Sequence, residues 1–147
     1  MSAMQRAKGQ AGERELAAEI HAATGWNVRR RVRQHDGDSD LEGVPGWSVE
    51  CKRHARATRS EIAVWWKQTV SQAERSGDLP VLFYRLDRAG WRAVWPLGLH
   101  LGGDWTGYEM TVEGSIDAWA AAARAGFQSG GFQGFQGKPD RGEVRHG

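Results

Sequence analysis

Residues 37–54, GDSDLEGVPGWSVECKRH, place an acidic turn directly before a short apolar run. A strand turns alternate side chains to opposite faces, so residues 47–52 would send an apolar set into the core and a polar set outward. The polar set contains Glu50 and Lys52, which would therefore be neighbours on one face. This stretch predicts a core strand that carries ionic side chains beside an acidic turn.

The sequence before this stretch predicts a helix and a strand. Apolar residues recur at helical spacing over residues 10–24, and Gly25 follows as a C-terminal cap. Residues 26–33 alternate, with Val28 and Val32 on one face and arginines on the other. We expect that strand to pair with residues 47–52.

The sequence after this stretch predicts a second helix, a hairpin, another strand and a last helix. A capping-box sequence at residues 58–61 starts the second helix, which Gly77 ends. Residues 80–86 and 91–95 form strands around a turn. The further elements are a strand near 108–112 and a helix over 116–124, capped by Ser115.

These elements predict one α/β domain over residues 8–126, with a mixed central sheet flanked by helices. The length of 147 residues and a hydrophobic fraction of 39% suit a single domain with a modest core. Residues 127–147 repeat Phe-Gln between glycines and predict a disordered tail. The alternative is a tail that contacts DNA or a partner through its phenylalanines.

Cys51 is the only cysteine, which rules out an intrachain disulfide and a cysteine-based zinc site. No stretch approaches the roughly 20 apolar residues of a membrane span, and the N-terminus lacks the apolar core of a signal peptide. The sequence therefore predicts a cytoplasmic protein without a membrane partner.

Asp40, in the acidic turn, and Glu50, on the strand, could share one divalent cation. Oxygen ligands of this kind suit Mg²⁺, with Mn²⁺ as an alternative. Lys52 on the same face could polarise a water or offset charge on a phosphate, so the set predicts phosphodiester hydrolysis. A Glu-x-Lys pair on a strand can also be an exposed pair of opposite charges, and Asp40 with its turn favours the catalytic interpretation.

The segment KGQAGERELAAEI, residues 8–20, resembles the first helix of archaeal-type Holliday-junction resolvases. Lys8-Gly9, Glu13-Arg14 and Leu16 match that family's pattern, and GDSDLEG, ECK and the hairpin at residues 80–95 continue it. The resemblance covers about residues 8–96. It implies the PD-(D/E)xK nuclease superfamily with its restriction-endonuclease-like fold.

The resemblance also implies roles for individual residues. Glu13, Asp40 and Glu50 would bind the metal and Lys52 would be the catalytic lysine, with Asp38 as a competitor for the role of Asp40. Superfamily members often place a glutamine from the second helix near the site, which makes Gln68 and Gln72 candidates; a solvated helix face is the alternative. The predicted DNA contacts are basic residues near these carboxylates: Lys8, Arg14, Arg29, Arg31, Arg33, Arg53 and Arg56.

The implied function is a metal-dependent DNA endonuclease, selective for four-way junctions and acting as a homodimer. Trp65, Trp66, Trp91 and Trp95 are more tryptophans than a small domain easily buries, so some are expected at a dimer interface. The alternatives are a related nuclease acting on other branched or duplex DNA, and a DNA-binding module of the same fold that does not cut.

Overall fold

The computed structural model of the chain describes residues 2–32, 39–103 and 106–125. The predicted tail over residues 127–147 lies outside the described residues, as do Arg33 and Asp38. The elements are α1 (Ala3–Thr24), β1 (Arg29–Arg30), β2 (Leu41–Glu42), β3 (Trp47–Arg53), α2 (Arg59–Ser76), β4 (Leu79–Arg85), β5 (Arg92–Pro96), α3 (Gly98–Leu101), the 3-10 helix η1 (Tyr108–Met110), β6 (Thr111–Gly114) and α4 (Ile116–Ala125).

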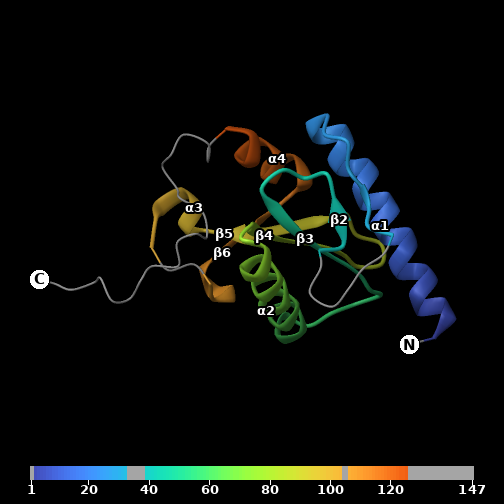
Figure 1. Ribbon diagram of the computed structural model, residues 1–147. Helices are drawn as coiled ribbons and strands as arrows, with labels where there is room; N and C mark the ends of the chain where they lie inside the picture. The colour runs from blue at the N-terminus through green and yellow to red at the C-terminus, as the bar shows by residue number, and fades with distance from the viewer. Residues whose placement is uncertain (1, 33–38, 104–105, 126–147) are drawn as a thin grey trace, which may run out of the picture.

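The main sheet has the order β3-β4-β5-β6. β3 runs parallel to β4 because the chain crosses over through α2 between them, whereas β4, β5 and β6 pair antiparallel through short connections. The helices α1 and α4 cover one face of the sheet and α2 covers the other (Figure 1). The expected mixed sheet flanked by helices is confirmed, and β3 is its edge strand.

The larger core cluster lies between the sheet and the pair α1 and α4. Trp119 of α4 is fully buried there and makes edge-to-face contacts with Trp47 and Phe83. Leu16 and Ile20 of α1 are also fully buried, as their helical spacing predicted. This cluster fixes α1 against β3.

The second core cluster lies under α2. The predicted capping box is present, because the Thr58 hydroxyl accepts from the Glu61 amide and the Glu61 side chain accepts from the Thr58 amide. Gly77 ends the helix in the left-handed conformation, also as predicted. The buried side of α2 packs on Leu82, Tyr84 and Val94, so its other side is exposed beside β3.

The strand expected over residues 26–33 is wrong in extent and in partner. Within residues 26–32, which the structure describes, only Arg29–Arg30 forms a strand, and its partner is β2 rather than β3. Val32, expected in the core, is 78% exposed. β2 has only two residues, so it cannot form ladder hydrogen bonds with eight residues of the expected strand. Val32, beyond Arg30, therefore has no sheet to pack against. The strand expected near residues 108–112 begins instead at Thr111, after η1.

The tryptophan argument for a dimer interface is also wrong. The exposed fractions of Trp65, Trp66, Trp91 and Trp95 are 8%, 1%, 9% and 4%. The two core clusters, one on each face of the sheet, provide more interior than a single layer would, and all four rings fit into them. Among the described residues, no helix is both long and apolar enough to cross a bilayer.

Candidate active site

Glu50 and Lys52 lie on edge strand β3 and face α2, as the alternation predicted. Glu50 is 5% exposed, and its Oε2 atom is 3.1 Å from Nζ of Lys52. Gln72 of α2 donates from Nε2 to the other carboxylate oxygen, Oε1, at 2.9 Å. Each oxygen of this buried carboxylate therefore has a partner that fixes its orientation.

Asp40 approaches β3 along the open edge of the sheet. Its amide donates to the Val49 carbonyl at 2.9 Å, and its Oδ2 atom accepts from the Cys51 amide at 2.8 Å. One backbone bond and one side-chain bond thus attach Asp40 to the free edge of β3. They bring the side chain of Asp40 beside Glu50, ten residues later in the sequence.

Asp40 has a strongly raised pKa. The pKa of this carboxyl is raised to about 8, first by burial and then by the negative charge of Glu50 and, more weakly, of Glu13. The Cys51 amide opposes the shift by stabilising the carboxylate. Two crowded carboxyls of this kind share the site without repulsion either by holding a proton or by binding a cation.

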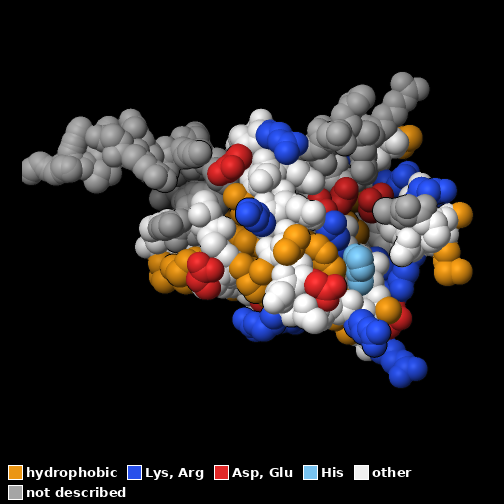
Figure 2. All heavy atoms as spheres, turned by 90° about the horizontal axis from the view of Figure 1, so that it is seen from below, with side chains coloured by type: hydrophobic (Ala, Val, Ile, Leu, Met, Phe, Trp, Pro, Cys, Tyr) orange, Lys and Arg blue, Asp and Glu red, His pale blue; other side chains and the backbone are white. Residues whose placement is uncertain are grey.

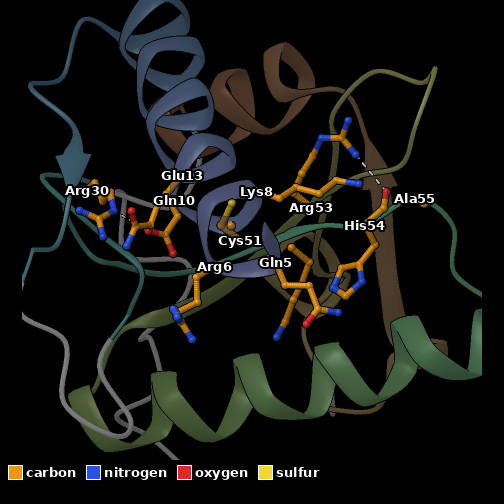
Figure 3. A pocket seen from close by; sticks show the side chains of 12 residues that line it. Gln5, Arg6, Lys8, Gln10, Glu13, Arg30, Cys51, Arg53, His54 and Ala55 are labelled. Carbon is orange, nitrogen blue, oxygen red and sulfur yellow. Dashed lines mark hydrogen bonds and ion pairs between the residues drawn. The ribbon is translucent and has the colours of Figure 1, made fainter. Parts of the chain in front are cut away.

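Glu13 of α1 is held by a different partner from Asp40 and Glu50. Its Oε1 atom accepts from Nε of Arg30 at 2.9 Å, and Figure 3 shows the two side chains pointing toward each other. Within the described part of the chain, no three His, Cys, Asp or Glu side chains lie close enough together to hold a metal ion. Asp40 and Glu50 are thus the pair that the fold brings together, and Glu13 adds charge from nearby.

Two hollows flank Lys52. One, of about 690 Å³, lies between α1 and the end of β3 (Figure 3). The other, of about 520 Å³, lies along α2 and is also lined by Glu50, Gln68 and Gln72. Lys52 thus lines both hollows. The two glutamines predicted near the site both line the hollow along α2, and among the described residues only Gln72 bonds to a carboxylate.

Several predicted DNA contacts are engaged in ion pairs with acidic residues far away in the sequence. Lys8 and Arg53 both bind Asp87, at 3.4 and 2.8 Å. Arg29 and Arg31 lie within 3.0 and 3.6 Å of Glu42. Their charges are thereby partly neutralised at the surface, which weakens their case as phosphate contacts.

Arg14 and Arg56 are exposed, and Arg14 lines a separate, shallow hollow with Arg29. Figure 2, which looks onto the α2 side of the molecule, shows basic and acidic side chains interspersed.

Sequence reasoning missed three charged groups near the site. Lys67 and Arg75 line the hollow along α2, and Arg30 holds Glu13. The first two carry a sequence signal, because Arg75 lies three positions after Gln72 and Lys67 lies four positions before Ser71, and such spacings share one side of a helix. Arg30 carries none, since its partner lies 17 positions away on another element.

An aspartate followed by Glu-x-Lys, with the latter on a strand of a mixed sheet, is the pattern of the PD-(D/E)xK nucleases. The family model described as "Phage putative PDDEXK endonuclease" matches residues 4–115. The chain belongs to this family, and the expected membership of the PD-(D/E)xK nucleases is confirmed.

Among solved structures, Hjc of Archaeoglobus fulgidus, a Holliday junction resolvase from an archaeal hyperthermophile, is similar at 21% identity with a TM-score of 0.46. That match covers 79% of this chain and 95% of the other. A search of curated proteins found no match.

Proposed function

We propose that the protein is a metal-dependent DNA endonuclease in which Asp40 and Glu50 bind the metal and Lys52 is the catalytic lysine. The observation that carries this proposal is that a buried carboxyl, Glu50, a half-buried carboxyl, Asp40, and the ammonium group of Lys52 lie together at an edge strand. Asp40 arrives there through its bonds to Val49 and Cys51, and Lys52 arrives through the strand alternation. A surface pair of opposite charges would not need a second, half-buried carboxyl with a raised pKa.

The donor set fits a hydrated Mg²⁺ or Mn²⁺ ion. Both carboxyls offer oxygen, which these cations prefer, and two carboxylates leave room for several waters and a phosphate oxygen. The buried Oε1 atom of Gln72 has no hydrogen-bond partner in the described part of the chain, although it is beside Glu50. A water bound to such an ion is a donor of the kind that this acceptor lacks.

A cation bound there would polarise a phosphoryl oxygen and make a bound water more acidic. The protein's own residues supply the rest. Gln72 holds the carboxylate of Glu50, and the Cys51 amide holds that of Asp40, so neither has to reorient when the substrate binds. Lys52 places a positive charge where negative charge grows on the phosphate. Glu13, held by Arg30, sets the local field and completes the acidic side of the site.

We propose four-way junctions as the preferred DNA substrate, cut by a homodimer that presents two such sites. The resemblance of residues 8–96 to the resolvase pattern supports this finer assignment. A junction is recognised by its shape, and a symmetric dimer presents two sites to it. The alternatives are cleavage of other branched or duplex DNA, and binding without cleavage.

One experiment separates these three activities. The full-length protein is incubated with a labelled four-way junction, a linear duplex of the same sequence and a flap, in Mg²⁺ and in EDTA. Paired symmetric nicks confined to the junction, lost in EDTA, are the expected result. Equal cleavage of duplex or flap supports the general nuclease, and binding without cleavage in Mg²⁺ rejects the endonuclease. Size-exclusion chromatography with light scattering tests the dimer.

A further inference from the structure

The side of α2 that borders the candidate site carries a continuous polar stripe. Six positions at helical spacing, five of them polar and one the exposed Val64, form it and line the hollow that Glu50 and Lys52 also line. We call this set the α2 stripe: Val64, Lys67, Gln68, Ser71, Gln72 and Arg75. It contains two cations and no acid, so its charge suits an anionic ligand.

The two cations of the α2 stripe are available to a ligand. Lys67 and Arg75 are exposed, and neither forms an ion pair with any other residue that the structure describes. In contrast, Arg53 and Arg29 are each within 3.0 Å of a carboxylate. A phosphate approaching Lys67 or Arg75 therefore displaces only solvent and counterions.

The spacing of the α2 stripe matches a nucleic-acid backbone. Lys67 and Arg75 are eight residues apart on a helix, which corresponds to about 12 Å along its axis. That distance corresponds to roughly three or four base-pair steps of rise along a duplex axis. Between them, Gln68 and Ser71 are exposed and add neutral hydrogen-bond donors of the kind that contact phosphate oxygens.

We propose that the α2 stripe binds the backbone phosphates of the DNA strand that is cut and leads that strand to Lys52. The proposal rests on the proposed function and names the surface that positions its substrate. Continuity is the reason for choosing this surface, because Lys52 and Glu50 line the same hollow as Lys67 and Arg75. The basic residues first expected to bind DNA contribute less, since ion pairs with Asp87 and Glu42 occupy most of them.

The test removes the two charges and compares that loss with an equal loss elsewhere. The variant is Lys67→Gln/Arg75→Gln. The control is Arg88→Gln/Arg124→Gln, which removes two exposed arginines from the β4–β5 turn and from α4, away from both hollows that Lys52 lines. Binding of the full-length protein to a labelled four-way junction and to a duplex is measured by fluorescence anisotropy in EDTA over a range of salt concentrations.

The stripe variant should bind at least about tenfold more weakly at 0.1 M salt, and its slope of log K against log salt should fall by about 2. The control should bind as wild type does. Wild-type affinity and slope in the stripe variant would overturn the proposal. So would an equal loss of affinity in the control.

Failure of this proposal is distinguishable from failure of the proposed function. A wild-type protein that binds but does not cut rejects the endonuclease, and the anisotropy measurement still decides the stripe. A protein that cuts normally while the stripe variant binds like wild type rejects the stripe alone. A wild-type protein that binds no DNA rejects both.

Discussion

The backbone amide of Cys51 donates a 2.8 Å hydrogen bond to Oδ2 of Asp40, which ties the acidic turn to the edge of the main sheet. This one bond places a carboxyl from an irregular segment beside Glu50, whose position follows from the strand itself. It also lowers the pKa of Asp40 against the effect of burial, so the site keeps an acceptor that a cation can use.

Replacing Lys52 by alanine should abolish cleavage and leave DNA affinity nearly unchanged. The ammonium group acts on charge that develops in the transition state, so we expect the rate at saturating DNA to fall by about 100-fold or more. Single-turnover cleavage and anisotropy measure the two effects. Glu50 loses its ion-pair partner in this variant, so thermal unfolding serves as the folding control. A variant that is folded and cuts normally contradicts the assigned role.

Replacing Asp40 by asparagine should stabilise the metal-free protein in a pH-dependent way. The pKa of Asp40 rises from 3.8 to about 8 on folding, so the folded chain binds the proton more tightly than the unfolded chain does. Wild type therefore loses stability as pH rises from about 4 to about 8, and the variant does not share this loss. The gain should be near zero at pH 4 and reach at least about 2 kcal/mol above pH 8. Thermal unfolding in EDTA across this range measures it.

Mg²⁺ provides the complementary measurement for Asp40. A cation that binds the ionised pair should raise the melting temperature of wild type more at pH 8 than at pH 5, because protons compete with it. The same addition should raise that of Asp40→Asn much less. Equal stabilisation of both proteins would show that the ion binds elsewhere.

Gln72→Met should weaken metal binding at the site more than it weakens the fold. Methionine keeps the approximate volume of the side chain and removes the bond to Glu50, so that carboxylate loses one of its two restraints. We expect the Mg²⁺ concentration for half-maximal cleavage to rise by about tenfold or more. Ser76→Ala, one turn along α2 and outside the hollow, is the control. A lower melting temperature with an unchanged Mg²⁺ requirement would reduce Gln72 to a packing residue.

Gly12→Ala and Gly9→Ala, both in α1, should change stability in opposite directions. A Cβ atom on Gly12 would lie 2.9 Å from Cβ of Arg53, so α1 would be pushed off β3 at a cost of about 1–3 kcal/mol. At Gly9 nothing lies within 4 Å, and alanine should stabilise the helix by up to about 1 kcal/mol. Urea unfolding of the two variants measures both. A stabilised Gly12→Ala would show that α1 packs less closely than described.

Local patterns in the sequence were enough for most elements. Alternation at residues 47–52 predicted which way Glu50 and Lys52 face, and the capping box at Thr58 predicted where α2 begins. The same reasoning failed at residues 26–33, because a strand needs a partner of matching length. No local sequence pattern predicts that the partner strand, β2, has only two residues.

The sequence by itself determined α2, α4 and the end of α1, the core strands, the membership of the PD-(D/E)xK nucleases and the neighbouring positions of Glu50 and Lys52, because these depend on periodicity and short spacings; α1 begins at Ala3 rather than at residue 10, and α3 and η1 were not predicted. Only the tertiary structure decided that Asp40 lies beside Glu50 and that Arg30 forms an ion pair with Glu13. It also decided that Asp87 pairs with Lys8 and Arg53. Lys67 and Arg75, in contrast, line the hollow along α2. Those relationships join separate segments of the chain, up to 79 positions apart. These contacts depend on burial and charge pairing in the folded chain, so no local sequence pattern predicts them.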